Sequence, residues 1–536
     1  MKERLNKERI LIRTLDIHHL DSFEQSLYTA QQTRDIDKLA IASVHKGDGF
    51  ALMTKAGRSL FNHACDQFPM KKRWLIFCGG GNNGGDGYVA ARLASEENIS
   101  VTVIQIGKVD ELDSELKGEA LEAYKTLNTY QVEHLSFDDF IRLYDRDGAF
   151  ELSEDLIIDA MLGTGLSGTV NDRYQSAIDW INSSSIDVLA VDIPSGLSSD
   201  TGIPLGRPVK ACQTLTFIGI NKGLVTSQAK AFTGQLFYDE LGIPTDIKSK
   251  VQSDCHLLST VELKGYLFKR SKTDHKGDSG RGLFIGGSDG TSGAALLSCE
   301  AALRAGVGLL VAITGKNAVA PLLTRTPEAM VRHFSDALVQ QINEFGRKAD
   351  AIAIGPGLAV NENSRLAVET VLQLGKPTLL DADALNLIAC SPDIWQMYGH
   401  KECVLTPHPL EASRLLGCTV ADVENDRFKA INRLVCKYQC TVLLKGSGTL
   451  ISSSSNNVVV SYLGNESLAT GGMGDVLSGM ILAFLAKSKN CFESTKLAAF
   501  VQSICSEMLS ENGIIGVLPS DIINNQRLVI NETLAK

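Results

Sequence analysis

A glycine-rich segment near the C-terminal end carries an aspartate in a position suited to phosphoryl transfer. Residues 469–479 read Ala-Thr-Gly-Gly-Met-Gly-Asp-Val-Leu-Ser-Gly and run directly into an apolar stretch that predicts a helix. Glycines before a helix leave backbone N–H groups open to a transferring phosphoryl group, and Asp475 can accept a hydroxyl proton. A lone aspartate at a helix start is also a common N-cap, so the residue by itself leaves both interpretations open.

Other polar residues of the C-terminal half follow short apolar runs. Lys445 opens the segment Lys-Gly-Ser-Gly-Thr at residues 445–449, where it is placed to meet a nucleotide phosphate or to end a strand in solvent. His408 stands between two prolines, which either aim its ring at a ligand or hold a structural histidine. Beside the glycine-rich segment of Asp475, these residues favour a kinase-like nucleotide site.

A second glycine-rich turn lies in the N-terminal half. Residues 79–87 read Gly-Gly-Gly-Asn-Asn-Gly-Gly-Asp-Gly, after the apolar run 74–78 and before a helix that we expect from about Tyr88. Such turns bind phosphates but also occur as plain strand-to-helix connections. The side-chain oxygens of Asn82, Asn83 and Asp86 favour binding of a ribose hydroxyl, an amide or a hard monovalent cation.

Two further aspartates follow buried apolar runs in the same half. Asp159 opens Asp-Ala-Met-Leu-Gly-Thr-Gly, and Asp192 opens Asp-Ile-Pro-Ser-Gly-Leu. A carboxylate beside a hydrophobic core costs free energy unless something pairs with it, which favours contact with a ligand or cation. Helix capping by Asp159 and a simple turn after Asp192 are the alternatives.

The elements that must position these residues are apolar runs that alternate with amphipathic stretches, as in parallel sheets with crossover helices. The runs lie at 74–78, 101–105, 156–158, 188–191, 283–285, 308–313, 351–354, 378–381, 403–406 and 441–444. The polar segment 244–254 separates the two series and predicts a domain boundary. We therefore predict an α/β protein with an N-terminal extension of little function at 1–27 and two domains at 28–245 and 246–536.

Composition narrows the class of protein. The 536 residues carry a net charge of -10 without a long Lys/Arg block, which argues against nucleic acid or an anionic membrane as a partner. The 12 cysteines form no CxxC pair, so neither a zinc ribbon nor a redox dithiol is indicated, and a reducing cytoplasm suits them. The charged N-terminus lacks an apolar signal segment, and Glu300 and Arg304 interrupt the apolar stretch 294–314. We expect a soluble cytoplasmic enzyme that acts on small molecules.

The N-terminal motifs resemble those of the YjeF N-terminal family, the NAD(P)H-hydrate epimerases, over about residues 28–243. The resemblance implies a Rossmann-like three-layer αβα domain that epimerises the hydroxylated ring carbon of hydrated NADH or NADPH. It also implies a K⁺ ion held by Asn83, Asp159 and Ser195, with Asp192 as the candidate acid or base. Thr33 departs from the methionine often found near the entry helix. The substrate-binding residues that the resemblance implies are Asn82, Asn83, Gly84, Gly85, Asp86, Gly163, Thr164, Gly165, Leu166, Ser167, Gly168, Thr169 and Asp192.

The C-terminal motifs resemble the ADP/ATP-dependent NAD(P)H-hydrate dehydratases, which have a ribokinase-like α/β fold, over about residues 276–521. The resemblance implies that ADP or ATP, with Mg²⁺, phosphorylates the hydrate hydroxyl and that phosphate then leaves. Asp475 would be catalytic. Leu410, Ala359 and Met473 depart from the family pattern, and Met473 removes a possible hydroxyl donor. The implied hydrate contacts are Ala295, Gly357, His408 and Asp475, and the implied nucleotide contacts are Lys445, Gly446, Ser447, Gly448, Thr449 and Gly474.

The order of the two domains resembles the fused bacterial repair enzymes, in which one activity supplies the epimer that the other consumes. That resemblance favours ADP over ATP, and we expect a homo-oligomer of open subunit number. Two rival interpretations remain: a kinase of a small alcohol such as a vitamin precursor, and a non-catalytic binding module at residues 28–243.

Overall fold

The apolar runs of the N-terminal half form a mainly parallel sheet in the computed structural model, which describes residues 13–14, 25–106, 116–147, 155–263, 271–335 and 337–533. Strand β3 is followed outward by β4 and β5 on one side, and by β6, β7, β8 and β10 on the other. The chain thus adds strands first on one side of β3 and then on the other, which makes a topological switch point between β3 and β6. Doubly wound sheets bind ligands at the carboxyl ends of the strands beside such a point. The strands, in sheet order, are β1 (Arg13–Thr14), β10 (Gln235–Asp239), β8 (Gln213–Phe217), β7 (Asp187–Val191), β6 (Asp155–Ala160), β3 (Arg73–Cys78), β4 (Ser100–Gln105) and β5 (Glu133–Ser136).

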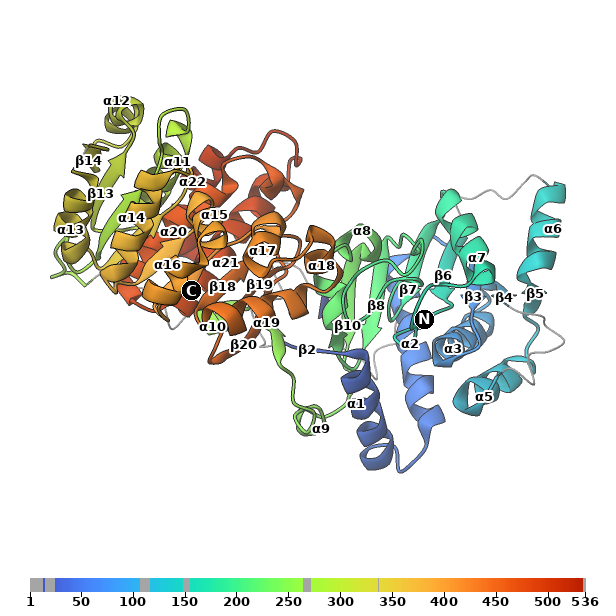
Figure 1. Cartoon of the computed structure of the whole chain (residues 1–536). Coiled ribbons are helices and arrows are strands. Elements are labelled where there is room, and N and C mark those ends of the chain that lie inside the picture. The colour runs from blue at the N-terminus through green and yellow to red at the C-terminus, as the bar shows by residue number, and fades with distance from the viewer. Residues whose placement is uncertain are drawn as a thin grey trace. The chain divides into compact units, whose positions relative to one another are not determined.

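Helices cover both faces of this sheet (Figure 1). Because side chains alternate between the faces of a strand, Ile76 of β3 packs with α2 (Gly49–Gln67), α3 (Asn82–Glu96) and α5 (Gly118–Leu127). Its neighbours Leu75 and Phe77 pack on the other face, with α6 (Phe137–Asp147) and α7 (Asp172–Ser183). Three layers result, as the sequence predicted.

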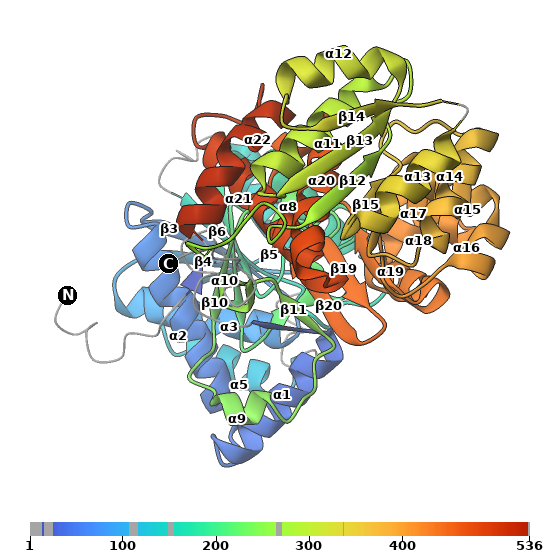
Figure 2. The ribbon, with the colours of Figure 1, turned by 90° about the vertical axis from the view of Figure 1, so that its left-hand side faces the viewer.

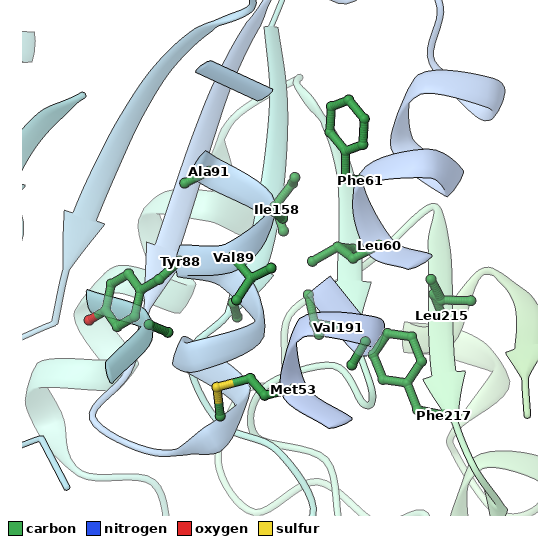
Figure 3. Packing of buried hydrophobic residues seen from close by; sticks show 14 of the residues in the cluster. Met53, Leu60, Phe61, Tyr88, Val89, Ala91, Ile158, Val191, Leu215 and Phe217 are labelled. Atoms are coloured by element: carbon green, nitrogen blue, oxygen red, sulfur yellow. The ribbon is translucent and has the colours of Figure 1, made fainter. Parts of the chain in front are cut away.

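The first helical layer is tightly packed (Figure 3). Met53 of α2, Val89 of α3, and Val191 and Phe217 of the sheet belong to one buried cluster. A Cβ atom on Gly57 would lie 2.4 Å from Cβ of Val89, so α2 and α3 can approach this closely only with glycine at that position. The layer is completed by α1 (Ala30–Ser43), whose Ile36 and Ala40 belong to the same core.

The C-terminal half forms a second, larger sheet. Strands β14 to β18 are parallel in the order β14-β13-β12-β15-β16-β17-β18, the hairpin β19-β20 follows antiparallel, and β11 pairs in parallel with β20. Residues 454–455 form the tip of that hairpin. The strands are β11 (Cys255–Leu257), β12 (Arg281–Ile285), β13 (Leu309–Thr314), β14 (Met330–His333), β15 (Ala351–Ile354), β16 (Thr378–Leu380), β17 (Cys403–Leu405), β18 (Thr441–Leu444), β19 (Thr449–Ser453) and β20 (Asn456–Ser461).

Two groups of helices enclose this sheet (Figure 2). The first group is α11 (Ser292–Arg304), α20 (Met473–Ser488), α21 (Cys491–Ser510) and α22 (Pro519–Leu528), which pack against one another. The second group covers the opposite face and consists of α13 (Leu338–Lys348), α14 (Glu362–Gln373), α15 (Asp383–Cys390), α16 (Pro392–Tyr398), α17 (Pro409–Leu416), α18 (Val420–Asn425) and α19 (Arg427–Tyr438). The predicted α/β class of both halves is therefore confirmed.

The remaining elements are short. They are β2 (Ser26–Tyr28), β9 (Ile220–Asn221), α8 (Lys230–Thr233), α9 (Thr245–Lys248), α10 (Thr260–Leu263), α12 (Lys316–Arg325) and the single turns Lys222–Val225, Glu466–Ala469 and Val529–Thr533. Strands β2 and β9 pair in parallel. In the described part of the chain, no helix is long and apolar enough to cross a membrane, and residues 294–314 form most of α11, the connection after it and strand β13.

The chain divides into two compact units between Asp254 and Cys255. The predicted limits of 28–245 and 246–536 remain a prediction, since the division concerns compactness alone. Within the extension at 1–27, Arg13 and Thr14 form β1 and pair antiparallel with β10, and Leu27 of β2 is fully buried. The other residues of that extension before Gln25 lie outside the described residues.

Candidate functional site

A cavity of about 730 Å³ opens at the carboxyl ends of β3, β6 and β7 in the first unit. The cavity lies beside the topological switch point between β3 and β6, as the strand order predicts. Most of the predicted residues of the N-terminal motifs line it. These are Asn82, Asn83, Asp86, Gly163, Thr164, Gly165, Leu166, Ser167 and Asp192.

Helix α3 begins at Asn82, with Gly81 as its extended N-cap, so the prediction of a helix from about Tyr88 is wrong. The glycines of this turn were assigned to a loop because glycine disfavours helices, but tertiary packing overrides that preference. A Cβ atom on Gly84 would lie 2.1 Å from the carbonyl oxygen of Gly79, and one on Gly85 would lie 2.5 Å from Cε of Met53. Gly84 and Gly85 are therefore required for close packing. The N-terminus of α3, where the first N–H groups of a helix have no partner within the helix, faces the cavity.

Two of the three predicted cation ligands, Asp159 and Ser195, are in contact at the ends of β6 and β7, and the third, Asn83, lies in the first turn of α3 after β3. Asp159 is fully buried, and its carboxylate accepts hydrogen bonds from the N–H of Ser195 at 2.8 Å and from its hydroxyl at 2.6 Å. Nearby, Asn83 is buried, and neither oxygen nor nitrogen of its amide has a hydrogen-bond partner among the described residues. An unpartnered buried amide oxygen costs free energy, and a cation contact would compensate it.

Four carboxylates line the same cavity, namely those of Asp37, Asp86, Glu119 and Asp192. Burial raises the pKa of Asp192 to about 6, although the hydroxyl of Thr216 donates to it at 3.1 Å. Burial and the negative charges of Asp192 and Asp37 raise the pKa of Asp86 well above its usual value. Burial and the charge of Asp192 likewise raise the pKa of Asp37 to about 7, against the opposing effect of Arg34.

Asp37 was missed by the sequence reasoning, because it lies on α1 among ordinary helical residues and belongs to no motif. Of the predicted set, Gly168 and Thr169 are exposed and, like Gly84 and Gly85, are not among the described residues that line the cavity. Thr33 does line it, and its hydroxyl accepts a hydrogen bond from Asn221 at 3.1 Å.

In the second unit, Asp475 lies in the first turn of α20, as the glycine-rich segment predicted. Gly472 precedes the helix with a φ of +94°, a conformation that L side chains rarely adopt. Burial and the charge of Asp381 raise the pKa of Asp475 to about 6, with Lys445 opposing them. The carboxylate therefore changes protonation just below neutrality, in the range suited to a proton acceptor.

Lys445 joins this turn to the strand ends. Its ammonium donates to the buried carboxylate of Asp381 at 2.6 Å, and the hydroxyl of Ser478 on α20 donates to the other oxygen of Asp381 at 2.6 Å. A Cβ atom on Gly474 would lie 3.4 Å from Nζ of Lys445, so the lysine lies over the turn. One buried carboxylate thus fixes both the lysine and the first turns of α20.

Arg427 of α19 supports the end of strand β18 and the start of the segment that follows it. This arginine is 1% exposed and donates to the carbonyl oxygens of Leu444 at 3.2 Å and Lys445 at 3.1 Å. Gly446 has a φ of +136°, and a Cβ atom there would lie 2.7 Å from Nη1 of Arg427. Sequence reasoning missed Arg427, since it lies 18 residues before Lys445 in an amphipathic helix without a motif.

His408 is the N-cap of α17. Its Nδ1 accepts from the N–H of Leu410 at 3.2 Å, and Glu411 completes a capping box by accepting from the N–H of His408 at 2.9 Å. The ring is therefore held by structure, since its Nε2 also lies 3.4 Å from the carboxylate of Glu411. Leu410, one of the three departures, is 43% exposed.

Gly357 and Ala295 lie at adjoining strand and helix ends. The carbonyl oxygen of Gly357 accepts from the hydroxyl of Thr291 at 2.8 Å, four residues before the fully buried Ala295. Ala359 has a φ of +68°, and its N–H donates to Asp383 at 2.8 Å. The last departure, Met473, is buried, and its carbonyl oxygen accepts from Gln502 at 2.7 Å.

The chain is similar to known proteins over nearly its whole length. A family described as YjeF-related protein N-terminus matches residues 49–223, and one described as NAD(P)H-hydrate dehydratase matches residues 283–527. The bifunctional NAD(P)H-hydrate repair enzyme Nnr of Escherichia coli (strain K12) is 39% identical over 484 residues, which cover 90% of each chain. The enzyme of the same name from Coxiella burnetii is 37% identical over 506 residues, which cover 94% of this chain and 99% of that relative.

Among solved structures, the ADP/ATP-dependent NAD(P)H-hydrate dehydratase of Bacillus subtilis, co-crystallised with ATP and Mg²⁺, is 28% identical. It covers 52% of this chain and 98% of its own, with a TM-score of 0.47. The two sequence relatives cover both units of this chain in the same order as the two site-bearing halves described above. The chain belongs to the family of bifunctional NAD(P)H-hydrate repair enzymes.

Proposed function

We propose that this chain repairs hydrated NADH and NADPH in two steps, each at its own site. The first unit interconverts the R and S hydrates, and the second dehydrates the S form at the expense of ADP or ATP. The observation that carries the proposal is that both sets of motif residues lie at the carboxyl ends of strands, within a chain whose relatives share both halves at 39% identity. A cavity lined by four carboxylates favours a catalytic N-terminal unit over a non-catalytic binding module.

In the first unit, the residues of the cavity suit a polar, hydroxylated ring. Asp192 is the proposed acid or base, and the N-terminus of α3 suits the pyrophosphate. A K⁺ ion would be held by Asn83, Asp159 and Ser195, and the unpartnered amide of Asn83 supports that set. The ion would supply a positive charge beside a dinucleotide in an otherwise acidic protein.

In the second unit, Asp475 takes the proton of the hydrate hydroxyl, whose oxygen then attacks the terminal phosphoryl group of the nucleotide. The N–H groups of the turn at Gly474, together with Lys445 and the 446–449 segment, stabilise the transferring phosphoryl group. Phosphate leaves with the C–O electron pair, and a proton is lost from the neighbouring ring carbon, which restores the double bond of NAD(P)H. Mg²⁺ would neutralise the charge of the nucleotide, and Ala295, Gly357 and His408 are the proposed contacts to the hydrate.

The test is an assay of the purified chain with a mixture of both hydrate epimers, K⁺, Mg²⁺ and either ADP or ATP. Full recovery of reduced-nicotinamide absorbance is expected, and comparison of the two nucleotides decides the preference, for which we expect ADP. Recovery of only the S fraction would contradict the epimerase half. Accumulation of a stable phosphorylated product would instead support a small-alcohol kinase.

We also expect a cytoplasmic location and a homo-oligomer. The cysteines in the described residues are free thiols, as a reducing compartment keeps them. Cell fractionation and light scattering of the purified chain test these two expectations.

A further inference from the structure

The inner face of α1 presents a carboxylate to the cavity of the first unit. Thr33, Asp37 and Ile41 all line the cavity and follow one another at four-residue spacing, so they form one stripe of the helix. Asp37 occupies the centre of that stripe, where an amphipathic helix ordinarily places an apolar side chain. Its oxygen Oδ1 is buried and has no hydrogen-bond partner among the described residues.

Helix α1 is anchored firmly, so Asp37 has a defined position. Thr29 and Gln32 form a capping box at its start, and the N–H of Ala30 donates to the carboxylate of Asp200 at 2.7 Å. The amide of Asn221 holds Thr33 one turn before Asp37. The helix is thus fixed by residues that lie about 170 and 188 positions further along the chain.

The charged and titratable groups around Asp37 come from five elements. Arg34 belongs to its own helix, Asp86 to α3, Glu119 to α5, Tyr174 to α7, and Asp192 follows β7. Arg34 lowers the pKa of Asp37, but burial and Asp192 dominate and raise it to about 7. Burial raises the pKa of Asp192 as well, to about 6, so the carboxyl groups of Asp37 and Asp192 both change protonation close to neutrality.

We propose that Asp37 is a second catalytic residue of the epimerisation and works as the acid or base partner of Asp192. This inference rests on the proposed epimerase activity of the first unit. Inversion of the hydroxylated ring carbon needs one group that protonates the departing hydroxyl and another that deprotonates the incoming water. Asp37 and Asp192 reach the cavity from different elements, α1 and the end of β7, which suits them to these two tasks.

The step balances as follows. Protonated Asp37 gives its proton to the ring hydroxyl, which leaves as water with the C–O electron pair, while the lone pair of the ring nitrogen forms a C=N bond. A water molecule then attacks the same carbon from the other side and gives a proton to ionised Asp192, and the C=N pair returns to nitrogen. One water leaves, one water enters, and one proton moves from Asp37 to Asp192. The reverse reaction exchanges the two roles.

The experiment compares Asp37→Asn with the wild-type full-length chain, using pure R hydrate, nucleotide, K⁺ and Mg²⁺ and subtracting the rate without enzyme. Epimerisation by Asp37→Asn should fall by roughly 100-fold or more, because general acid–base groups contribute about that much. Dehydration of pure S hydrate by the same sample should be unchanged, which verifies that the chain is active. Asp35→Asn is the matched control on the same helix, since Asp35 is exposed beside Lys38 and does not line the cavity.

A pH profile separates catalysis from mere support of the fold. The wild-type epimerisation rate should be bell-shaped, falling at low pH where both carboxyl groups are protonated and at high pH where both are ionised. Asp37→Asn should lose one limb of the bell, and Asp37→Glu should restore both limbs with part of the rate. An unchanged rate, or a lower rate with both limbs intact, would overturn the assignment of Asp37. Absence of epimerisation by the wild-type chain would instead overturn the proposed function.

Discussion

At the scale of single residues, both proposed sites depend on carboxylates whose pKa values are raised by burial. Asp475 is the clearest case in the second unit, because its pKa lies at about 6 while Lys445 and Asp381 lie beside it. The sequence already singled out this aspartate from its glycines. Its neighbours come from residues 64 positions apart and could not be paired from the sequence.

Asp475→Asn should lower dehydration of the S hydrate by roughly 100-fold to 10,000-fold, because the variant cannot accept the hydroxyl proton. Epimerisation at the other site should be unaffected. In the wild type, the dehydration rate should rise with pH through about 6, since the proton acceptor must be ionised. Steady-state rates at several pH values check both expectations, and a wild-type rate independent of pH between 5 and 8 would count against Asp475 as the base.

The carboxylate of Asp37 should also affect stability. Because the folded-state pKa of Asp37 is raised to about 7, the contribution of this carboxyl group to the free energy of unfolding is fully present below the unfolded-state pKa of 3.8. That contribution is lost as the pH rises through about 7. Asp37→Asn should therefore stabilise the first unit by about 1–2 kcal/mol at pH 8, after allowance for partial solvent exposure, and hardly at all near pH 4. Calorimetric unfolding at the two pH values measures this. A variant less stable than wild type at pH 8 would show that the carboxylate has a structural role.

At the scale of elements, the proposed site residues lie at helix termini and strand ends. Neighbouring helices contribute side chains that hold these ends in position. Helix α19 contributes Arg427, which holds the strand end and the segment beginning at Lys445. The sequence predicted strand β18 and its polar end correctly, because local apolar patterning specifies both. It did not indicate that a buried guanidinium lies beneath them.

Arg427→Met should leave the carbonyl oxygens of Leu444 and Lys445 without their donor, at a cost of about 1–3 kcal/mol. We expect KM for the nucleotide to rise roughly tenfold while KM for the hydrate changes little, because the 446–449 segment loses its support. Arg433→Met is the matched control, since Arg433 is exposed on the same helix. Equal increases in both KM values would indicate a general loss of structure instead.

At the scale of the whole molecule, the chain consists of two compact units, and each unit holds one of the two proposed sites. Each proposed activity should therefore be removable without the other. The chemistry links them only through the hydrate that both bind.

A mixture of Asp192→Asn and Asp475→Asn chains tests this independence. Neither variant alone should convert the R hydrate to NAD(P)H, whereas the mixture should convert it completely, because the S hydrate passes through solution from one chain to the other. Recovery of reduced-nicotinamide absorbance is the measurement. If the mixture left the R hydrate unconverted, direct transfer of the S hydrate within one chain would be required.

The sequence by itself determined the α/β class, most of the strands and the two glycine-rich turns, since apolar runs and glycine content are local properties. It also located Asp192 and Asp475, each of which stands in a distinctive local segment. Only the tertiary structure decided that α3 begins at Asn82 and that Asp37 faces the cavity. For α3, packing against residues distant in the sequence overrides the local preference of glycine against helix. For Asp37, burial beside Asp192, which lies 155 residues further along the chain, raises the pKa of an ordinary helical aspartate.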